Sequence, residues 1–238
     1  MGYPPRVCFD GALYHVTTRG DNREPVFLDA TDYQHFLRLL GRYKERFRFT
    51  LHAYALMPNH IHLIVEPAAG TTVSRIMQCL TITYTKWFNR RHGRVGHVFQ
   101  GRFHSRLIEQ DAYLLVASRY VHLNPVRARL VRRPADYAWS SYRAYQQPLG
   151  DPLRLVDTAT LLSLVDPGTR EPQRAYQEFV EKTWRPEVEG EGWGQKIILG
   201  SPAFEQAIRS QFSLVSRPRG RPKKTRKMVS DTIFGGRT

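Results

Sequence analysis

The sequence predicts an α+β fold in which strands and helices follow one another in the order strand, helix, strand, strand, helix, strand. Three observations predict it: short β-rich segments lie between glycines or prolines, two longer segments repeat apolar residues at helical intervals, and the two middle strands are divided by a three-residue turn. This order is the ferredoxin-like βαββαβ arrangement around an antiparallel sheet. Such a sheet leaves one face free to receive a further helix.

The N-terminal part supplies the first strand and the first helix. Residues 13–18 alternate in character between Gly11 and Gly20, which predicts a strand. Thr31 and Gln34 have the spacing of a capping box, and the apolar residues that follow recur at helical intervals. The sequence therefore predicts a helix that opens at this capping box.

A hairpin and a second helix come next. Residues 49–56 and 60–66 are rich in β-forming residues, and Met57-Pro58-Asn59 between them suits a tight turn. The helix is predicted from about Thr72 to Gly93, which supplies a stop.

Residues 98–108 alternate again and predict the fourth strand. A third helix is expected to open at Asp111 as N-cap and to close at Asn124-Pro125. This helix can dock on the free face of the sheet.

The character of the chain changes past Tyr145. We predict a βαββαβ domain with its extra helix at residues 8–146, a small helical accessory domain at 147–213 and a basic, disordered tail at 214–238. Within the accessory region we expect short helices at residues 161–165 and 175–184, an acidic linker at 187–193, and a helix that begins at Ser201-Pro202 and reaches about Phe212.

The charge of the chain favours a polyanionic partner. The 238 residues include 36 Lys and Arg against 21 Asp and Glu, a net charge of +15. Residues 1–150 carry +11 and residues 217–227 add seven positive charges, whereas residues 151–216 carry −3. Nucleic acid fits this distribution best, because Lys and Arg side chains bind phosphates and release counterions. The alternative is a basic protein without such a partner.

The two cysteines, Cys8 and Cys79, are far apart and belong to no CxxC motif. The sequence therefore supports neither a disulfide framework nor a thiolate zinc site. It shows neither a signal peptide pattern nor an apolar run long enough to cross a membrane, so we expect a cytoplasmic protein.

His60 and His62 begin the second arm of the hairpin and are separated by one aliphatic residue. Alternate side chains of a strand point to the same face, so the two imidazoles are spaced to bind one metal ion. A solvated or hydrogen-bonded surface pair is the alternative. Glu66 has the same parity but lies further along the strand, so we regard it as an outside candidate.

Tyr120 and Asn124 lie four residues apart on the third helix, on one face of it. Asn124 offers an amide oxygen as a third metal ligand, and the Tyr120 hydroxyl then lies beside whatever the metal binds. This arrangement suits attack of the phenol on a phosphodiester, which gives a phosphotyrosine and a free 3′-hydroxyl. The alternative is that Tyr120 packs in the core and Asn124 only ends the helix. Tyr113 is the competing nucleophile.

The sequence resembles the HUH single-tyrosine transposases, in particular the REP-associated tyrosine transposases of bacteria. The likeness covers about residues 8–146 and is carried by His60-Ile61-His62 and by residues 14–20, 57–60, 98–103, 120–128 and 139–142.

The resemblance implies a single-stranded DNA endonuclease and strand transferase that depends on Mg²⁺ or Mn²⁺ and works through a 5′-phosphotyrosine. It assigns the nucleophile to Tyr120 and the metal ligands to His60, His62 and Asn124. Relatives recognise REP-type hairpins, so hairpin DNA is the expected partner, in a bacterial, nucleoid-associated setting. Other relatives act as dimers, but we expect that a monomer suffices. A non-catalytic DNA-binding regulator and a metal-dependent nuclease that activates water are the alternatives.

Two basic regions are candidates for DNA binding. The first is a group around the end of the second helix and the fourth strand, consisting of Arg90, Arg91, Arg94, Arg102 and Arg106. Among the nearby aromatics, Trp87, Phe99 and Phe103, at least two are expected in the core rather than stacked on bases. The second region is the tail, where Pro-Arg-Gly-Arg-Pro around Arg219 and Arg221 resembles the AT-hook core, which places arginines in a narrow minor groove. A plain polybasic tail is the alternative.

Overall fold

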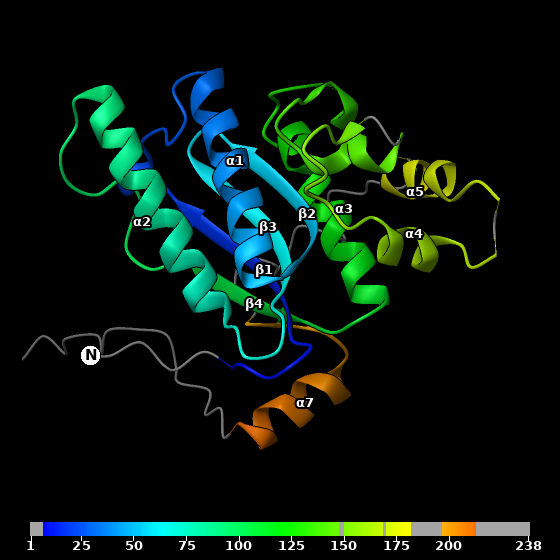
Figure 1. Ribbon diagram of the computed structural model, residues 1–238. Helices are drawn as coiled ribbons and strands as arrows, with labels where there is room; N and C mark the ends of the chain where they lie inside the picture. The colour runs from blue at the N-terminus through cyan, green and yellow to red at the C-terminus, as the bar shows by residue number, and fades with distance from the viewer. Residues whose placement is uncertain (1–6, 148–149, 169, 182–196, 213–238) are drawn as a thin grey trace, which may run out of the picture.

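The computed structural model describes residues 7–147, 150–168, 170–181 and 197–212. A five-stranded sheet lies at the centre, with helices on both faces (Figure 1). The strands are β1 (Leu13–Arg19), β2 (Thr50–Met57), β3 (His60–Glu66), β4 (His104–Ile108) and β5 (Ile198–Leu199). The helices are α1 (Ala30–Phe47), α2 (Val73–His92), α3 (Ala112–Arg127), α4 (Ala159–Val165), α5 (Pro172–Glu181) and α7 (Pro202–Gln211), and the 3-10 turns are η1 (Asp21–Arg23), η2 (Pro134–Asp136) and η3 (Ser141–Tyr145).

The strands lie in the order β2-β3-β1-β4-β5. β3 is antiparallel to its neighbours β1 and β2, and β4 is antiparallel to β1, which confirms the ferredoxin-like α+β arrangement. The sheet also has a fifth strand that was not predicted, β5, which pairs in parallel with β4 at one edge. β5 has only two residues, and so short a segment shows no alternation that a sequence pattern can reveal.

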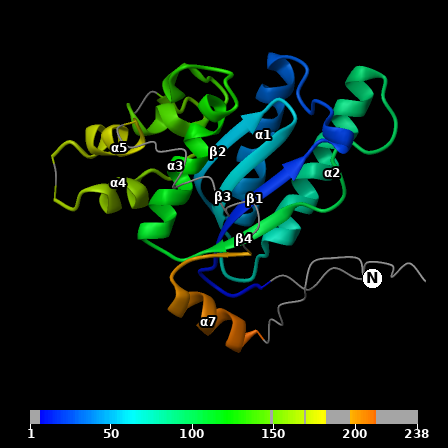
Figure 2. The same cartoon turned by 180° about the vertical axis from the view of Figure 1, so that it is seen from behind.

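The two faces of the sheet support different helices. Val16 and Leu63 belong to the apolar cluster under α1 and α2, whereas Leu13 and Ile64 belong to the cluster under α3. Alternation along β1 and β3 thus divides the side chains between two cores. Figures 1 and 2 show α1 and α2 on one side of the sheet and α3, with α4 and α5 beyond it, on the other.

Several predicted boundaries are confirmed. The hairpin of β2 and β3 turns at Pro58 and Asn59, α2 lies between its N-cap Thr72 and its C-cap Gly93, and α7 follows the N-cap Ser201. None of the helices in the described residues is long and apolar enough to span a membrane. The acidic linker predicted at 187–193 lies outside the described residues.

The capping box of α1 differs from the predicted one. Asp29, with an extended backbone, is the N-cap, and its carboxylate accepts from the backbone N–H groups of Thr31 and Asp32. Thr31 already lies in the first turn, so it is not the cap. The buried carboxylate of Asp32 also accepts from Arg91, which ties the start of α1 to the end of α2.

The fourth strand, β4, is shorter than the alternating segment at residues 98–108 that predicted it. Phe99 forms an isolated bridge with Gly20, and the regular ladder of β4 begins only at His104. Gly101 between them has φ of +60°, a left-handed conformation that interrupts the extended backbone. Phe99 is buried, and Phe103 and Trp87 also pack against the core, as expected for at least two of the three.

One predicted end of α3 is confirmed and the other is wrong. The helix begins directly after Asp111, as predicted. Asp111 makes no side-chain hydrogen bond to the helix, and its φ is 65°, so it is not a conventional N-cap. At the other end the helix continues through Pro125 to Arg127. A proline inside the last turn lacks only its own N–H bond, and Ala128 still donates to the carbonyl oxygen of Asn124 at 2.9 Å.

The segment around Trp139 joins the edge of β2 to α3. The N–H of Leu56 donates to the carbonyl oxygen of Trp139 at 2.9 Å, and the N–H of Tyr54 donates to Ser141 Oγ at 2.8 Å. Ser141 Oγ also lies 2.8 Å from His122 Nε2 on the buried side of α3. These bonds hold α3 in one position and rotation over the sheet.

The elements after residue 147 add to the same two cores. Leu155 and Ile208 pack in the cluster under α1 and α2, and Leu161 and Tyr176 pack in the cluster under α3. Tyr176 Oη lies 2.9 Å from His122 Nδ1, so α5 completes the hydrogen bonding of that histidine. The division into a catalytic and an accessory domain stays a prediction.

We predict that Ser141→Ala destabilises the protein by about 2 kcal/mol, because the buried N–H of Tyr54 and the ring of His122 both lose a partner. The free energy of unfolding in urea measures the effect. Ser163→Ala, in the exposed part of α4, is the control and should be nearly neutral. Equal free energies for the two variants would contradict the role of Ser141.

Candidate catalytic site

The side chains predicted to carry chemistry meet on the face of the sheet that α3 covers. On β3, His60 pairs with Arg19 of β1, and His62 pairs with Thr17. Directly paired residues of antiparallel strands point to the same face, and so do alternate residues along one strand. His15, two residues before Thr17, therefore joins this face.

Tyr120 of α3 lies directly over the histidines. The centre of its ring is 5.7 Å from that of His15 and 5.9 Å from that of His62, edge to face in both cases. The rings of His60 and His62 are 4.9 Å apart. The ring of Tyr120 thus lies beside those of His15 and His62 within one chain. Tyr120 is half-buried and also packs against the apolar cluster under α3.

Asn59 determines which nitrogen of His60 carries the proton. His60 Nδ1 lies 2.7 Å from Asn59 Oδ1, and an amide oxygen only accepts hydrogen bonds. Nδ1 is therefore the donor, and Nε2 of a neutral His60 keeps its lone pair. The amide is oriented by a second bond, 3.1 Å long, from Asn59 Nδ2 to the carbonyl oxygen of Arg23.

Gly20 makes this orientation of Asn59 possible. The chain folds back so closely after β1 that a Cβ at Gly20 would lie 2.0 Å from the carbonyl oxygen of Glu24. The same turn lets the Gly20 N–H donate to the carbonyl oxygen of Asn59 at 2.8 Å.

His15 contacts His62 in a similar way. His15 Nε2 lies 2.9 Å from His62 Nδ1, while Nε2 of His62 is buried and without a hydrogen-bond partner in the structure. When His62 donates through Nδ1, its buried Nε2 offers a lone pair toward the site. A buried imidazole nitrogen without a partner fits a metal ligand.

Burial keeps these imidazoles neutral. It lowers the pKa of His15 to about 3, with a smaller effect of the Arg106 charge, and that of His60 to about 4, with a smaller effect of Arg19. The pKa of His62 is lowered well below its usual value, first by burial and then by the neighbouring His15 and His60. Neutral imidazoles are the form that binds metal ions.

Arginines surround the same site. Arg19 and Arg106 are the cations that act on the histidines, and Arg106 pairs with His15 across β1 and β4. The guanidinium carbon of Arg127 lies 4.8 Å from the centre of the Tyr120 ring. The site thus combines neutral nitrogen ligands with positive charge, which suits an anionic substrate.

Asn124 lies one turn after Tyr120, where its Nδ2 donates to the carbonyl oxygen of Tyr120 at 2.7 Å. Its Oδ1 takes no part in that bond. Across the part of the chain that the structure describes, no three His, Cys, Asp or Glu side chains are grouped to hold a metal ion. Within the described residues, the potential metal ligands of this site are therefore the two imidazoles of His60 and His62 and the amide oxygen of Asn124.

The other candidates lie in different places. Tyr113 and Tyr120 both pack against the apolar cluster under α3, but Tyr120 is the one with ring contacts to His15 and His62. Glu66 lies 3.4 Å from the buried His52 at the far end of β3. Arg91 is paired with Asp29 at 2.8 Å, and Arg94 with Glu24 at 2.6 Å.

The predicted arginine group is therefore spread over several surfaces. Arg90 is exposed on the last turn of α2, and Arg102 borders a groove beside α2. Of this group only Arg106, which pairs with His15, lies on the face of the sheet that carries the histidines. Arg219 and Arg221 lie outside the described residues. A role of these arginines in DNA binding stays a prediction.

His15, Asn59, Arg19 and Arg127 are absent from the predicted site. The parity of His15 with Thr17 and Arg19 along the first strand places it on one face of that strand, but the register between β1 and β3 is needed to bring it to His62. Arg127 falls beyond Pro125, where the helix was expected to have ended.

We predict that the metal-free protein loses stability as the pH falls from about 6.5 to about 4. In this window His15 and His60 take up protons in the unfolded chain. In the folded protein they stay neutral, because their pKa values are lowered to about 3 and about 4. His15→Gln should reduce the slope of unfolding free energy against pH by about 1 kcal/mol per pH unit. Urea denaturation in a chelating buffer measures the slope, with exposed His97→Gln as the control. Identical slopes in both variants would contradict the assignment.

Comparisons with known proteins show which family and which fold the chain resembles. The model of the family described as IS200-like transposases matches residues 8–124. A protein of Haemophilus influenzae with the provisional name REP-associated tyrosine transposase is 28% identical over 145 residues, which cover 56% of this chain and 80% of that protein. The structure of a REP-associated tyrosine transposase bound to a REP hairpin superimposes on this one with a TM-score of 0.54 at 21% identity. The match covers 67% of this chain and 96% of that chain, and it confirms the fold. Through residues 8–124 the chain is similar to the family of IS200-like transposases.

Proposed function

We propose that this protein cuts and rejoins single-stranded DNA beside a hairpin through a covalent bond to Tyr120. The observation that carries the proposal is the contact of the Tyr120 ring with the rings of His15 and His62, among arginines that attract phosphate. The name of the Haemophilus influenzae relative and the REP hairpin bound to the similar structure support REP-type hairpins as the class of DNA.

In the cleavage step the Tyr120 oxygen attacks phosphorus. A bond forms between Oη and phosphorus, the bond from phosphorus to the 3′ oxygen breaks, the phenol loses its proton, and the leaving oxygen gains one. The products are a 5′-phosphotyrosine and a 3′-hydroxyl. Because the new ester retains the energy of the broken one, another 3′-hydroxyl can reverse the step without ATP.

His60, His62 and Asn124 are the residues that would hold a divalent cation, and this cation would polarise the scissile phosphate. Imidazoles alone suit late transition metals, whereas oxygen ligands suit Mg²⁺ and Mn²⁺. We propose Mg²⁺ or Mn²⁺ on the strength of the family likeness. Arg127, beside the Tyr120 ring, places a positive charge where the phenol becomes negative.

The histidines and the tyrosine come from the same chain, which supports the proposal that a monomer suffices. In the βαββαβ domain, Arg90 and Arg102 remain candidates for contacts with the DNA backbone, whereas Arg91 and Arg94 hold carboxylates. The tail with Arg219 and Arg221 is proposed to add minor-groove or phosphate contacts.

We predict that the wild-type protein, incubated with Mn²⁺ and labelled hairpin DNA that carries single-stranded flanks, forms an adduct that survives denaturation. Tyr120→Phe should abolish the adduct because it removes the nucleophilic oxygen. Tyr113→Phe, on the same face of α3, is the matched control and should retain it. The measurement is the labelled band that migrates with protein on a denaturing gel.

Two results would count against the proposal. Cleavage that persists in Tyr120→Phe would indicate a nuclease that activates water. Binding of the hairpin without cleavage by the wild type would indicate a DNA-binding regulator.

The hydrogen-bond partners of the histidines give a second prediction. Asn59→Ala and His15→Phe should each weaken Mn²⁺ binding about tenfold, because they remove the bonds that orient His60 and His62. Titration calorimetry without DNA measures the affinity. The exposed Gln100→Ala should not change it, and His62→Ala should abolish it. Unchanged affinity in both test variants would show that these bonds do not serve the metal site.

A further inference from the structure

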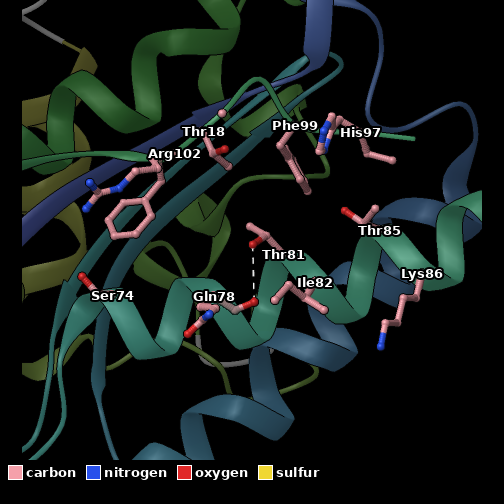
Figure 3. A pocket seen from close by; sticks show the side chains of 13 residues that line it. Thr18, Ser74, Gln78, Thr81, Ile82, Thr85, Lys86, His97, Phe99 and Arg102 are labelled. Atoms are coloured by element: carbon pink, nitrogen blue, oxygen red, sulfur yellow. Dashed lines mark hydrogen bonds between the residues drawn. The ribbon is translucent and has the colours of Figure 1, made fainter. Parts of the chain in front are cut away.

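A groove of about 590 Å³ lies on the other face of the sheet from the histidines, between α2 and the chain at residues 97–103 (Figure 3). Thr18 of β1 borders it from the sheet. Thr18 pairs with Ile61, a core residue on the α1 and α2 side, which places the groove on that face.

The charge of the groove favours an anion. Its lining includes Lys86 and Arg102, together with His97, and contains no Asp or Glu among the described residues. Lys86 is exposed at one end, near the C-terminal part of α2, and Arg102 lies toward the other end in Figure 3. Phosphates are attracted to a concave surface that carries positive charge without compensating carboxylates.

The walls of the groove suit bases as well as phosphates. Ser74, Gln78 and Thr85 form a polar row on α2 that extends over about 16 Å at about 1.5 Å per residue. Ile82, an apolar side chain that is 47% exposed, lies in the same row, and Phe99 points toward α2 from the opposite wall (Figure 3). An apolar surface beside hydrogen-bonding groups accepts unstacked bases, whereas a duplex presents mainly its phosphates.

The end of β1 separates the groove from the site at the histidines. The N–H of Gln100 donates to the carbonyl oxygen of Arg19 at 2.8 Å, which attaches this wall to the end of β1. Thr18 borders the groove, while its neighbours Thr17 and Arg19 lie on the catalytic face, paired with His62 and His60. A strand that leaves the catalytic site therefore needs only to pass this edge to enter the groove.

We propose that the groove binds unpaired nucleotides of the DNA strand that Tyr120 cleaves. The proposal rests on the proposed function for the identity of the strand, but it is tested by binding alone. Lys86 and Arg102 would hold phosphates, and the exposed side chain of Ile82 would receive bases.

The test compares two fluorescein-labelled probes, an oligothymidylate and a blunt-ended hairpin without unpaired ends. Their binding to the full chain is measured by fluorescence anisotropy in a chelating buffer, where no metal-dependent cleavage occurs. The variants are Lys86→Glu and Ile82→Glu, both at exposed positions of α2. Arg174→Glu on α5, with 71% of its side chain exposed, is the control that makes the same charge change as Lys86→Glu.

We expect both groove variants to weaken oligothymidylate binding at least about fivefold more than Arg174→Glu does, and to leave hairpin binding at the level of the control. The salt dependence of oligothymidylate binding should also become shallower in Lys86→Glu, because one phosphate contact is lost. Groove variants that match the control on both probes would overturn the proposal.

Equal weakening of both probes would also overturn it, because the groove would then contact duplex phosphates. These outcomes are separate from the test of the proposed function. A protein that binds oligothymidylate through the groove can still fail to form the Tyr120 adduct, and the reverse also holds.

Discussion

The site depends on the packing of α3 across β1 and β3. Apolar side chains of α3 cover Leu13 and Ile64, while His122 on its far side bonds to Ser141 and Tyr176. A helix packed only by apolar contacts can rotate or slide more easily than one held by directional bonds at a buried position. The position of Tyr120 over the histidines therefore follows from bonds made on the opposite side of the same helix.

The same face of the sheet keeps its histidines neutral and aligned. Burial disfavours protonation of His15, His60 and His62, and Arg19 and Arg106 act in the same direction. The arginines are compatible with buried imidazoles only because the imidazoles stay uncharged. One arrangement thus combines neutral imidazole lone pairs with positive charge, and the groove behind it adds a second surface that carries Lys86 and Arg102.

Elements with strong local signals are the ones that could be predicted. The hairpin at Pro58-Asn59, α2 between Thr72 and Gly93, and the Ser201 cap of α7 all follow from short-range rules of turns and caps. The errors have more than one cause. Asp29 caps α1 in place of Thr31, Gly101 interrupts an alternating segment, and β5 exists only because it finds the edge of β4.

The sequence by itself determined the order of strands and helices, the basic character of the chain, and the identity of Tyr120, His60, His62 and Asn124 as candidates, since residue type and spacing along one element suffice for these. The register between β1 and β3 and the rotation of α3 were decided only by the tertiary structure. They bring His15 to His62, Tyr120 to both of these histidines and Thr18 to the groove beside α2. The physical reason is that these contacts join residues far apart in the chain, so their geometry arises from packing and not from local preference.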